Sequence, residues 1–584
     1  MKPSTDLAEV NGGTIIHKPS LFDYLGPHLD ARPDNLAVIA VHHEADYLKE
    51  LVRTAPSDAS GDASQRCLQW TYGQMQHVAL KLVAGLQRRG VRPGSRVVTL
   101  LPNGIEWALL LWSSILGIFT LCALDVAALG EARSAELKNL LMQLKPDAVF
   151  VPDGSEVQAV ENALPKDRSG TVIKICLSSD IIEKDWTDFC TFAAKTPEQS
   201  EISRITAEAH EDDLERIQLI FFTSGTTSGR PKGCPRRVGS HLQTIEALKW
   251  GSWNNASARN LLQSANFRII APSLALASWS AGACVVMPGL SFQASTTLHA
   301  IETHKARSVV LVPAMVHALV AEPRFPEVDK SSLRTILIGG DMVTEGIYKK
   351  TCEAFPRCEI IVVYASTEGG SAHTYHTIGK IGQQELSYLY NLAPLGKVAP
   401  GTRLRIVNEA NESVLRDEVG EIHVCSNAYV TQYLNGEQSE NFYVDKHGNW
   451  FKTGDMGLIN KDGFLYMTGR KKDIIKRAGV PIAPAALESC IDSFLQTQSS
   501  VLGIEHDVLG QEPFVVVQSL NGKTSDEVKK QVVDVVSKDY AIAGVATLAE
   551  LGLSAFPLNA TGKVLKRELV GPVSNYMDRL RNGK

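Results

Sequence analysis

Four short apolar runs constrain the possible folds of this 584-residue chain more than any other feature. Segments that are apolar along their whole length are typical of strands buried on both faces, as in a parallel sheet. Glycine, proline or small polar residues follow each run closely, as expected where a core strand ends in a turn. The runs are residues 217–222, 309–312, 335–338 and 359–363. They predict an α/β fold built on parallel core strands.

The turns after these strands are the expected place for a binding site. Ligands of doubly wound sheets bind outside the carboxyl ends of the strands. We therefore expect residues 223–233, 339–341 and 364–370 to converge on one site.

The rest of the pattern predicts two domains of unequal size. Thr71 and Gln74 have capping-box spacing ahead of an apolar stripe, which predicts a helix that stops at Gly90 before a strand. After Gly469 a compact unit of helices and strands begins, and the charged run 470–473 at the junction is a candidate hinge. We expect a large N-terminal α/β domain with parallel sheets at residues 1–469 and a small, mobile α+β domain at residues 470–584.

Charge and cysteine usage exclude several classes of protein. The chain has 59 Lys+Arg against 64 Asp+Glu, a formal net charge of −5, which does not favour nucleic-acid binding. Its ten cysteines include no Cys-x-x-Cys pair, so we expect neither a zinc site nor a disulfide framework. The uncharged stretch 107–124 reaches the length of a membrane span, but Gly117 is expected to end a buried helix within it. We expect no membrane span.

Targeting signals are not evident at either end. The N-terminus lacks the basic-then-apolar order of a secretory signal. The final residues Asn582-Gly583-Lys584 are not a Ser-Lys-Leu type peroxisomal signal. We expect a cytoplasmic protein, with a peroxisomal location left open.

The strongest local motif is FFTSGTTSGRPKG at residues 221–233. Its hydroxyl side chains alternate with glycines, so hydroxyl and backbone N–H groups can both contact a polyphosphate. A Walker loop is excluded because Pro231 precedes the lysine and Gly233 follows it. A flexible surface loop is the alternative, but the apolar strand leading into the motif favours phosphate binding. The expected phosphate-binding residues are Thr223, Ser224, Gly225, Thr226, Thr227 and Lys232.

Together with four later motifs, this loop resembles the adenylate-forming superfamily, which includes acyl-CoA synthetases, aryl-CoA ligases, luciferases and adenylation domains of peptide synthetases. The later motifs are YASTEGG at 364–370, WFKTGDMG at 450–457, GRKKDIIKRAG at 469–479 and NATGKVLKREL at 559–569. The resemblance spans nearly the whole chain. It implies that a carboxylate attacks the α-phosphate of ATP, that pyrophosphate leaves, and that a thiol then captures the acyl-adenylate.

The resemblance also implies roles at the nucleotide. Glu368 is expected to bind Mg²⁺, which prefers hard oxygen ligands, and Thr367 to hydrogen-bond the α-phosphate. Asp455 is expected to accept hydrogen bonds from both ribose hydroxyls, with Arg470 bracing the same nucleotide. The alternatives are a helix cap for Thr367-Glu368 and an ordinary turn residue for Asp455. The remaining nucleotide-binding residues implied are Tyr364 and the adenine-side turn Gly339, Gly340 and Asp341.

Four further residues are assigned roles by the same resemblance. Lys563 resembles the catalytic lysine of the adenylation step, and Lys472 occupies the hinge position. Rotation there would exchange the face that carries Lys563 for the face that carries Gly479, which is expected to line a thiol tunnel. Phe267 is expected to line the carboxylate channel, with ordinary core packing as the alternative.

We therefore expect an ATP-dependent carboxylic acid ligase that uses Mg²⁺ and transfers the acyl group to coenzyme A. Because no carrier domain is seen after Lys563, delivery to a separate carrier protein is one alternative. A catalytically inactive nucleotide-binding homologue is another, and the joint presence of the five expected catalytic and nucleotide-binding side chains argues against it. These side chains are Thr367, Glu368, Asp455, Arg470 and Lys563.

Overall fold

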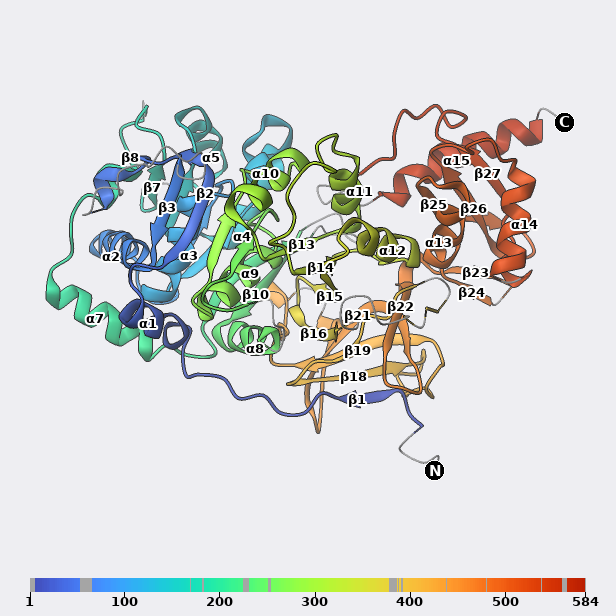
Figure 1. Cartoon of the computed structure of the whole chain (residues 1–584), viewed down its shortest axis with the longest axis horizontal. Coiled ribbons are helices and arrows are strands. Elements are labelled where there is room, and N and C mark those ends of the chain that lie inside the picture. Colours follow the sequence, from blue (N-terminus) through green and yellow to red (C-terminus); the bar gives the residue numbers. More distant parts are fainter. Residues whose placement is uncertain are drawn as a thin grey trace.

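The computed structural model describes residues 6–52, 66–166, 168, 170–180, 183–223, 231–249, 254–377, 386, 388–389, 392–436, 439–478, 480–536, 538–558 and 564–582. These residues form four β-sheets of nine, seven, six and five strands, with helices packed against them (Figure 1). The three larger sheets use residues up to Arg470, and the five-stranded sheet uses residues from Ile475 onward. The predicted α/β fold class is confirmed.

The nine-stranded sheet is parallel in its interior and antiparallel at both edges. In spatial order its strands are β17 (Lys397–Val398), β16 (Gly370–Thr377), β15 (Glu359–Ser366), β14 (Thr335–Gly339), β13 (Ser308–Leu311), β11 (Arg259–Leu261), β12 (Cys284–Met287), β2 (Leu36–Glu44) and β3 (Cys67–Thr71). Three of the four predicted core strands are β13, β14 and β15, which pair side by side in parallel.

The fourth predicted core strand lies in the seven-stranded sheet. That sheet runs in the order β10 (Lys232–Arg237), β9 (Ile217–Thr223), β5 (Thr120–Ala123), β4 (Arg96–Thr99), β6 (Ala148–Val151), β7 (Ile173–Cys176) and β8 (Trp186–Asp188). β9 pairs in parallel with β5 and antiparallel with β10. All four predicted strands thus take part in parallel pairing, but they occupy two sheets. An apolar run predicts that a strand is buried, but it does not predict which strands lie beside it.

The largest core lies between these two sheets. It joins residues of both sheets to the helices α2 (Tyr72–Arg88), α3 (Ile105–Leu116), α8 (Val238–Leu248) and α9 (Ile270–Ser280). All of α3 is buried, which suits a helix that is apolar around its circumference. The uncharged stretch 107–124 is thus most of α3, its end at Gly117, and β5, as predicted. No helix among the described residues is both long and apolar enough to cross a membrane.

The other helices before the C-terminal part are α1 (Phe22–Ala31), α4 (Ser134–Leu144), α5 (Val157–Ala163), α6 (Phe189–Ala193), α7 (Gln199–His210), α10 (Ala294–His304), α11 (Pro313–Ala321) and α12 (Glu345–Ala354). Of these, α4 and α5 pack on the seven-stranded sheet and α10, α11 and α12 on the nine-stranded sheet, each set in a core of its own. The helices α1, α6 and α7 join the largest core. The ten cysteines are all free, as predicted, and eight of them are buried. The cytoplasmic location stays a prediction.

The capping box at the start of α2 offers a direct stability test. Thr71 Oγ1 accepts a hydrogen bond from the Gln74 N–H at 3.2 Å, and the Gln74 side chain accepts one from the Thr71 N–H at 2.9 Å. We expect Thr71→Ala to lower the free energy of unfolding by about 1 kcal/mol, because an N–H of the first turn loses its acceptor. Urea unfolding followed by tryptophan fluorescence measures this. Gln76→Ala, on the same helix but away from the cap, is the control, and equal losses in both variants would contradict the assignment.

A six-stranded antiparallel sheet follows the nine-stranded one along the chain. Its strands are β1 (Glu9–Asn11), β18 (Thr402–Val407), β19 (Gly420–Ser426), β21 (Gly448–Ile459), β20 (Phe442–Asp445) and β22 (Leu465–Arg470). Figure 1 shows β18, β19 and β21 beside the end of β16. β22 is the last strand before the C-terminal sheet, so this sheet supplies the connection between the two parts.

The C-terminal part has its own sheet and cores. Its strands are β24 (Val480–Ile482), β23 (Ile475–Arg477), β26 (Gly510–Val517), β25 (Ser499–His506) and β27 (Gly544–Thr547). Alternate residues of β26 enter two different cores, so each face of the sheet is covered. One core contains α13 (Pro484–Leu495) and α14 (Ser525–Val535), and the other contains α15 (Lys566–Asn582). The expected α+β order after Gly469 is present, and a capping box of Thr524 and Glu527 begins α14.

Candidate active site

Asp455 is presented by a bulge in β21. In the pairing of β19 with β21, residues 453–455 lie opposite Ile422 alone. Thr453 Oγ1 donates a hydrogen bond to the Ile422 carbonyl at 2.7 Å, which fastens the bulge. Gly454 has a φ of +71°, a conformation that favours glycine. Bulges of this kind re-aim side chains next to active sites, and here the bulge takes Asp455 out of the ladder with β19, while Asp455 still pairs with Arg470 of β22.

One hydrogen bond and one ion pair hold the Asp455 carboxylate. The Tyr364 hydroxyl donates to Oδ2 at 2.5 Å, and Arg470 Nε lies 2.8 Å from Oδ1. Asp455 is 3% exposed, whereas the Arg470 side chain is 46% exposed, so the carboxylate is buried and its ion-pair partner borders solvent. The Asp455 carboxylate raises the pKa of Arg470, while burial and the same carboxylate raise the pKa of Tyr364 well above its ordinary value. Both partners therefore stay protonated as donors, and the structure brings three of the predicted nucleotide residues together.

Glu368 is fixed through its side chain and its backbone. It lies four residues beyond Tyr364, just after β15. The Tyr433 hydroxyl donates to Glu368 Oε1 at 2.8 Å, and the Glu368 carbonyl accepts from Arg236 Nη1 at 2.6 Å and from the Val430 N–H at 2.8 Å. Burial, followed by the Glu368 charge, raises the pKa of Tyr433, so the phenol remains a donor. The predicted role of the half-buried Thr367 in this turn stays a prediction.

The phosphate motif is the loop of a β-hairpin. Thr223 ends β9, Lys232 begins β10, and the two lie directly opposite each other. Lys232 is 8% exposed, and its Nζ lies 5.0 Å from the centroid of the Tyr433 ring. Tyr433 thus contacts both Lys232 and Glu368, so the predicted convergence of 223–233 with 364–370 holds for the described residues. The loop residues Ser224, Gly225, Thr226 and Thr227 lie outside the described residues.

The expected adenine-side turn lies beside the same strand. Gly339 ends β14 directly opposite Val363 of β15. A Cβ on Gly339 would lie 2.3 Å from the Val363 carbonyl oxygen, so this close approach requires glycine. Gly340 and Asp341 follow at an exposed position. The third predicted segment therefore joins the other two, while its contact with adenine stays a prediction.

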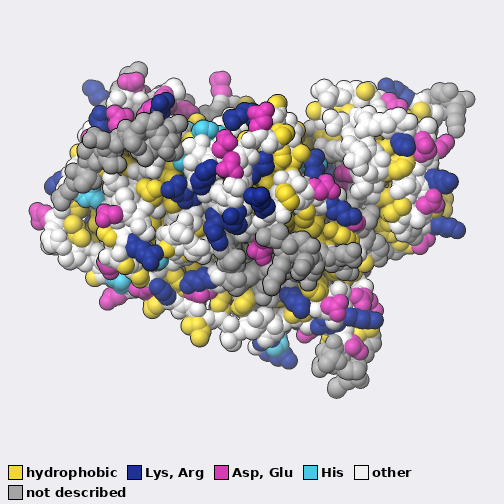
Figure 2. All heavy atoms as spheres, viewed as in Figure 1, with side chains coloured by type: hydrophobic (Ala, Val, Ile, Leu, Met, Phe, Trp, Pro, Cys, Tyr) yellow, Lys and Arg dark blue, Asp and Glu magenta, His cyan; other side chains and the backbone are white. Residues whose placement is uncertain are grey.

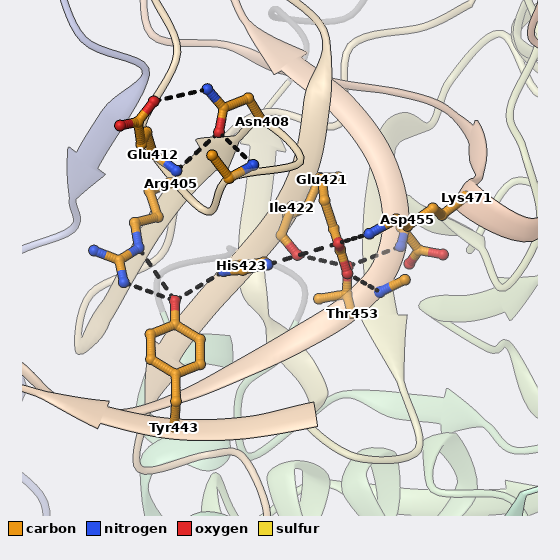
Figure 3. A network of polar contacts seen from close by, with 12 residues as sticks. Arg405, Asn408, Glu412, Glu421, Ile422, His423, Tyr443, Thr453, Asp455 and Lys471 are labelled. Carbon is orange, nitrogen blue, oxygen red and sulfur yellow. Dashed lines mark hydrogen bonds and ion pairs between the residues drawn. The ribbon is translucent and has the colours of Figure 1, made fainter. Parts of the chain in front are cut away.

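The predicted hinge lies next to Asp455 in space. Arg470 ends β22, and residues Lys471–Asp473 form a short 3₁₀ turn before β23. Lys471 Nζ lies 2.7 Å from Glu421 Oε2, and Figure 3 shows Glu421 between Lys471 and the bulge. Burial lowers the pKa of Lys472, the residue expected to act as the pivot. Rotation at this position stays a prediction.

Lys563 and Gly479 lie outside the described residues. The flanks of the lysine segment are described: Leu558 and Val564 form an antiparallel bridge, and the Leu565 N–H donates to the Pro557 carbonyl at 2.8 Å. The ends of the segment 559–563 are therefore held together on the C-terminal part. The catalytic role of Lys563 stays a prediction.

Phe267 lies just before α9 and is half-buried. The guanidinium carbon of Arg268 lies 5.0 Å from the centroid of its ring. This contact fits both a channel wall and ordinary packing, so the place of Phe267 in a carboxylate channel stays a prediction.

Three residues of the site were missed from the sequence: Arg236, Glu421 and Tyr433. Glu421 is a charged residue in a fully buried strand, and a buried charge requires a partner. Arg236 gives no such signal, because its strand also carries Lys232 and Arg237. Tyr433 carries no comparable signal, because it lies 65 residues from Glu368 and outside every motif.

Comparison with known proteins adds to this geometry. The family described as AMP-binding enzyme matches residues 52–434. The chain belongs to this family. An acyl-CoA ligase of Pestalotiopsis microspora is 34% identical over 580 residues, covering 98% of this chain and 99% of that protein. A 4-coumarate-CoA ligase of Narcissus pseudonarcissus is 25% identical over 510 residues, covering 85% of this chain and 88% of that protein.

The fold of the AMP-binding family is also found among solved structures. An anthranilate CoA ligase in complex with anthranoyl-AMP superposes with a TM-score of 0.76 at 19% identity, covering 95% of this chain and 97% of that one. The match extends through both the large and the small part. The chain is therefore an enzyme of the ligase class with the fold that the sequence predicted.

Proposed function

We propose that this enzyme is an ATP-dependent acid–thiol ligase that forms an acyl-adenylate, releases pyrophosphate and transfers the acyl group to coenzyme A. The observation that carries the proposal is the cluster of Asp455, Tyr364 and Arg470 beside Glu368 and Lys232. It offers acceptors for a ribose and a cation for phosphates within one site. The names of the full-length relatives support the same reaction.

The nucleotide would lie across the end of β15. The Asp455 carboxylate would accept hydrogen bonds from the ribose hydroxyls, and Lys232 with the hydroxyls of the hairpin loop would hold the β- and γ-phosphates. Figure 2 shows Lys and Arg side chains gathered near the middle of one face, over the region where Figure 1 places α4 and β13. Such a local excess of positive charge suits polyphosphate ligands on a chain whose formal net charge is −5.

Glu368 fits a Mg²⁺ ligand in the presence of ATP. Mg²⁺ is usually bound by one or two carboxylates together with substrate phosphates and water. Among the described residues no group of three or more His, Cys, Asp or Glu side chains could hold a metal alone, and Glu368 presents a single oriented carboxylate. When bound, the ion would neutralise charge on the phosphates.

A Tyr433→Phe substitution tests this role. The change removes the hydroxyl that orients Glu368 Oε1 but keeps the ring over Lys232. We expect the Mg²⁺ concentration for half-maximal pyrophosphate exchange to rise about tenfold, the lower end of the effect of one lost hydrogen bond to a charged group. Titration of Mg²⁺ at saturating ATP measures it. Tyr443→Phe, in the same sheet but away from Glu368, is the control, and an equal rise there would contradict the role.

Two half-reactions require two placements of the C-terminal part. In the first, the ammonium group of Lys563 would stabilise the charge that develops at the α-phosphate. In the second, rotation at Lys472 would remove Lys563 and bring residues near Gly479 to the thiol. The separate sheet and cores from Ile475 onward support a lobe that moves as one body about Lys472.

Pyrophosphate exchange tests the whole proposal. We expect acid-dependent incorporation of labelled pyrophosphate into ATP with at least one member of a panel of fatty, aryl and amino acids. The mass of the product formed with coenzyme A, or with a carrier protein, then identifies the acceptor. Absence of exchange across the panel would favour the inactive nucleotide-binding alternative. Acylation of the carrier protein, with no product from coenzyme A, would favour delivery to a separate carrier protein.

A further inference from the structure

Glu421 is a buried carboxylate that the reaction described above does not use. It lies in β19, and its side chain is 11% exposed. Glu421 Oε1 accepts a hydrogen bond from the Gly454 N–H at 3.3 Å. Gly454 is the middle residue of the bulge that presents Asp455, and a bulge leaves such an N–H without a ladder partner. Glu421 Oε1 is therefore the acceptor that the strand pairing does not provide for the Gly454 N–H, next to Asp455.

The second oxygen of the same carboxylate binds the hinge. Lys471 Nζ lies 2.7 Å from Glu421 Oε2, and His423 Nε2 lies 3.8 Å from it (Figure 3). Burial alone would raise the pKa of Glu421, but His423 and Lys471 hold it at about 2. Lys471 directly follows Arg470, the residue paired with Asp455. Two successive hinge residues thus bind two carboxylates on neighbouring strands.

We propose that Glu421 is a positioning residue that links the Asp455 bulge to the orientation of the C-terminal lobe through Lys471. The inference rests on the proposed function, because it assumes a lobe that turns at Lys472. The Gly454 hydrogen bond belongs to the large domain and persists in both orientations. Lys471 directly precedes the pivot, in the same 3₁₀ turn, so its ion pair with Glu421 fixes the conformation of that turn and stabilises the orientation seen here over the alternative.

Three substitutions separate the two contacts. Glu421→Gln keeps an oxygen acceptor for the Gly454 N–H but loses the charge that pairs with Lys471. Lys471→Met removes the ion pair alone, and Glu421→Ala removes both contacts. Lys476→Met is the matched control, because Lys476 Nζ lies 3.4 Å from Glu409 Oε1 in an ion pair that also joins the two parts but is 72% and 88% exposed.

Nucleotide binding tests the bulge. We expect calorimetric titration with AMP, without acid, to show about fivefold weaker binding to Glu421→Ala and less than twofold change for Glu421→Gln and Lys471→Met. Rescue by glutamine separates positioning from a general loss of structure. Equal weakening in Glu421→Gln and Glu421→Ala would overturn this half of the proposal. This readout needs only the nucleotide, so it stands even if no acid supports pyrophosphate exchange.

Half-reaction rates test the hinge contact. The ratio of the pyrophosphate-exchange rate to the rate of thioester formation from preformed adenylate should change about threefold in both Glu421→Gln and Lys471→Met. The double variant should match the single variants, because all three lack the same ion pair. An unchanged ratio, or the same change in Lys476→Met, would overturn the proposal. Wild-type exchange in the same assay shows whether the proposed function itself holds.

Discussion

Lys563→Ala is expected to slow acyl-adenylate formation by about 100- to 1,000-fold, the effect of removing one preorganised donor worth about 3–4 kcal/mol from a transition state. The same variant should convert preformed acyl-adenylate and coenzyme A to thioester at close to the wild-type rate. The physical reason is that its ammonium group serves only the lobe orientation in which the α-phosphate reacts. Single-turnover measurement of each half-reaction checks both statements.

Lys566→Ala is the matched control for this experiment. Lys566 lies three residues beyond Lys563, and its Nζ pairs with Glu488 Oε1 at 2.7 Å within the C-terminal lobe. Its loss removes a lysine from the same segment without removing the expected catalytic group. Equal loss of both half-reactions in Lys563→Ala, or equal slowing in the two variants, would contradict the division of labour between lobe orientations.

Asp455→Asn is expected to lower kcat/KM for ATP by roughly 10- to 100-fold, because hydrogen bonds to a charged group are worth about 1.5–3 kcal/mol. The variant keeps the size of the side chain but loses the charge that pairs with Arg470. The loss should appear mainly as a higher KM for ATP in pyrophosphate exchange. Asp462→Asn, an exposed turn residue of the same sheet, should leave KM unchanged.

A modified nucleotide makes this test specific for the ribose. Wild-type enzyme should use 2′-deoxy-ATP about tenfold less well than ATP, because one acceptor on Asp455 loses its donor. Asp455→Asn should discriminate much less between the two nucleotides. If the variant keeps the full wild-type discrimination, Asp455 does not bind the ribose, and its effect is on the packing of Arg470 and Tyr364.

Much of the fold could be predicted because local patterns decide it. The capping boxes at Thr71 and Thr524 and the apolar runs of β13, β14 and β15 each determine their own element. The sheet to which a strand belongs depends on partners far along the chain, so the place of β9 in a second sheet could not be read from its sequence.

The site, too, contains residues that the sequence could predict and residues that it could not. Asp455, Glu368 and Lys232 stand in motifs whose residue types reflect the chemistry, and the structure places them around Tyr364 and Tyr433. The partners that orient them come from other strands and loops. The bulge that presents Asp455 depends on the pairing of β19 with β21, which no single segment encodes.

The end of β15 bears on where a reaction intermediate would be held between the two half-reactions. One short segment carries both Tyr364, which holds Asp455, the proposed ribose ligand, and Glu368, the proposed Mg²⁺ ligand. The spacing between the two proposed contacts is therefore set within the large domain alone. An intermediate anchored at these two points can keep its place throughout the turnover cycle while the smaller lobe exchanges one set of reacting groups for another, so the intermediate need not dissociate between the two chemical steps.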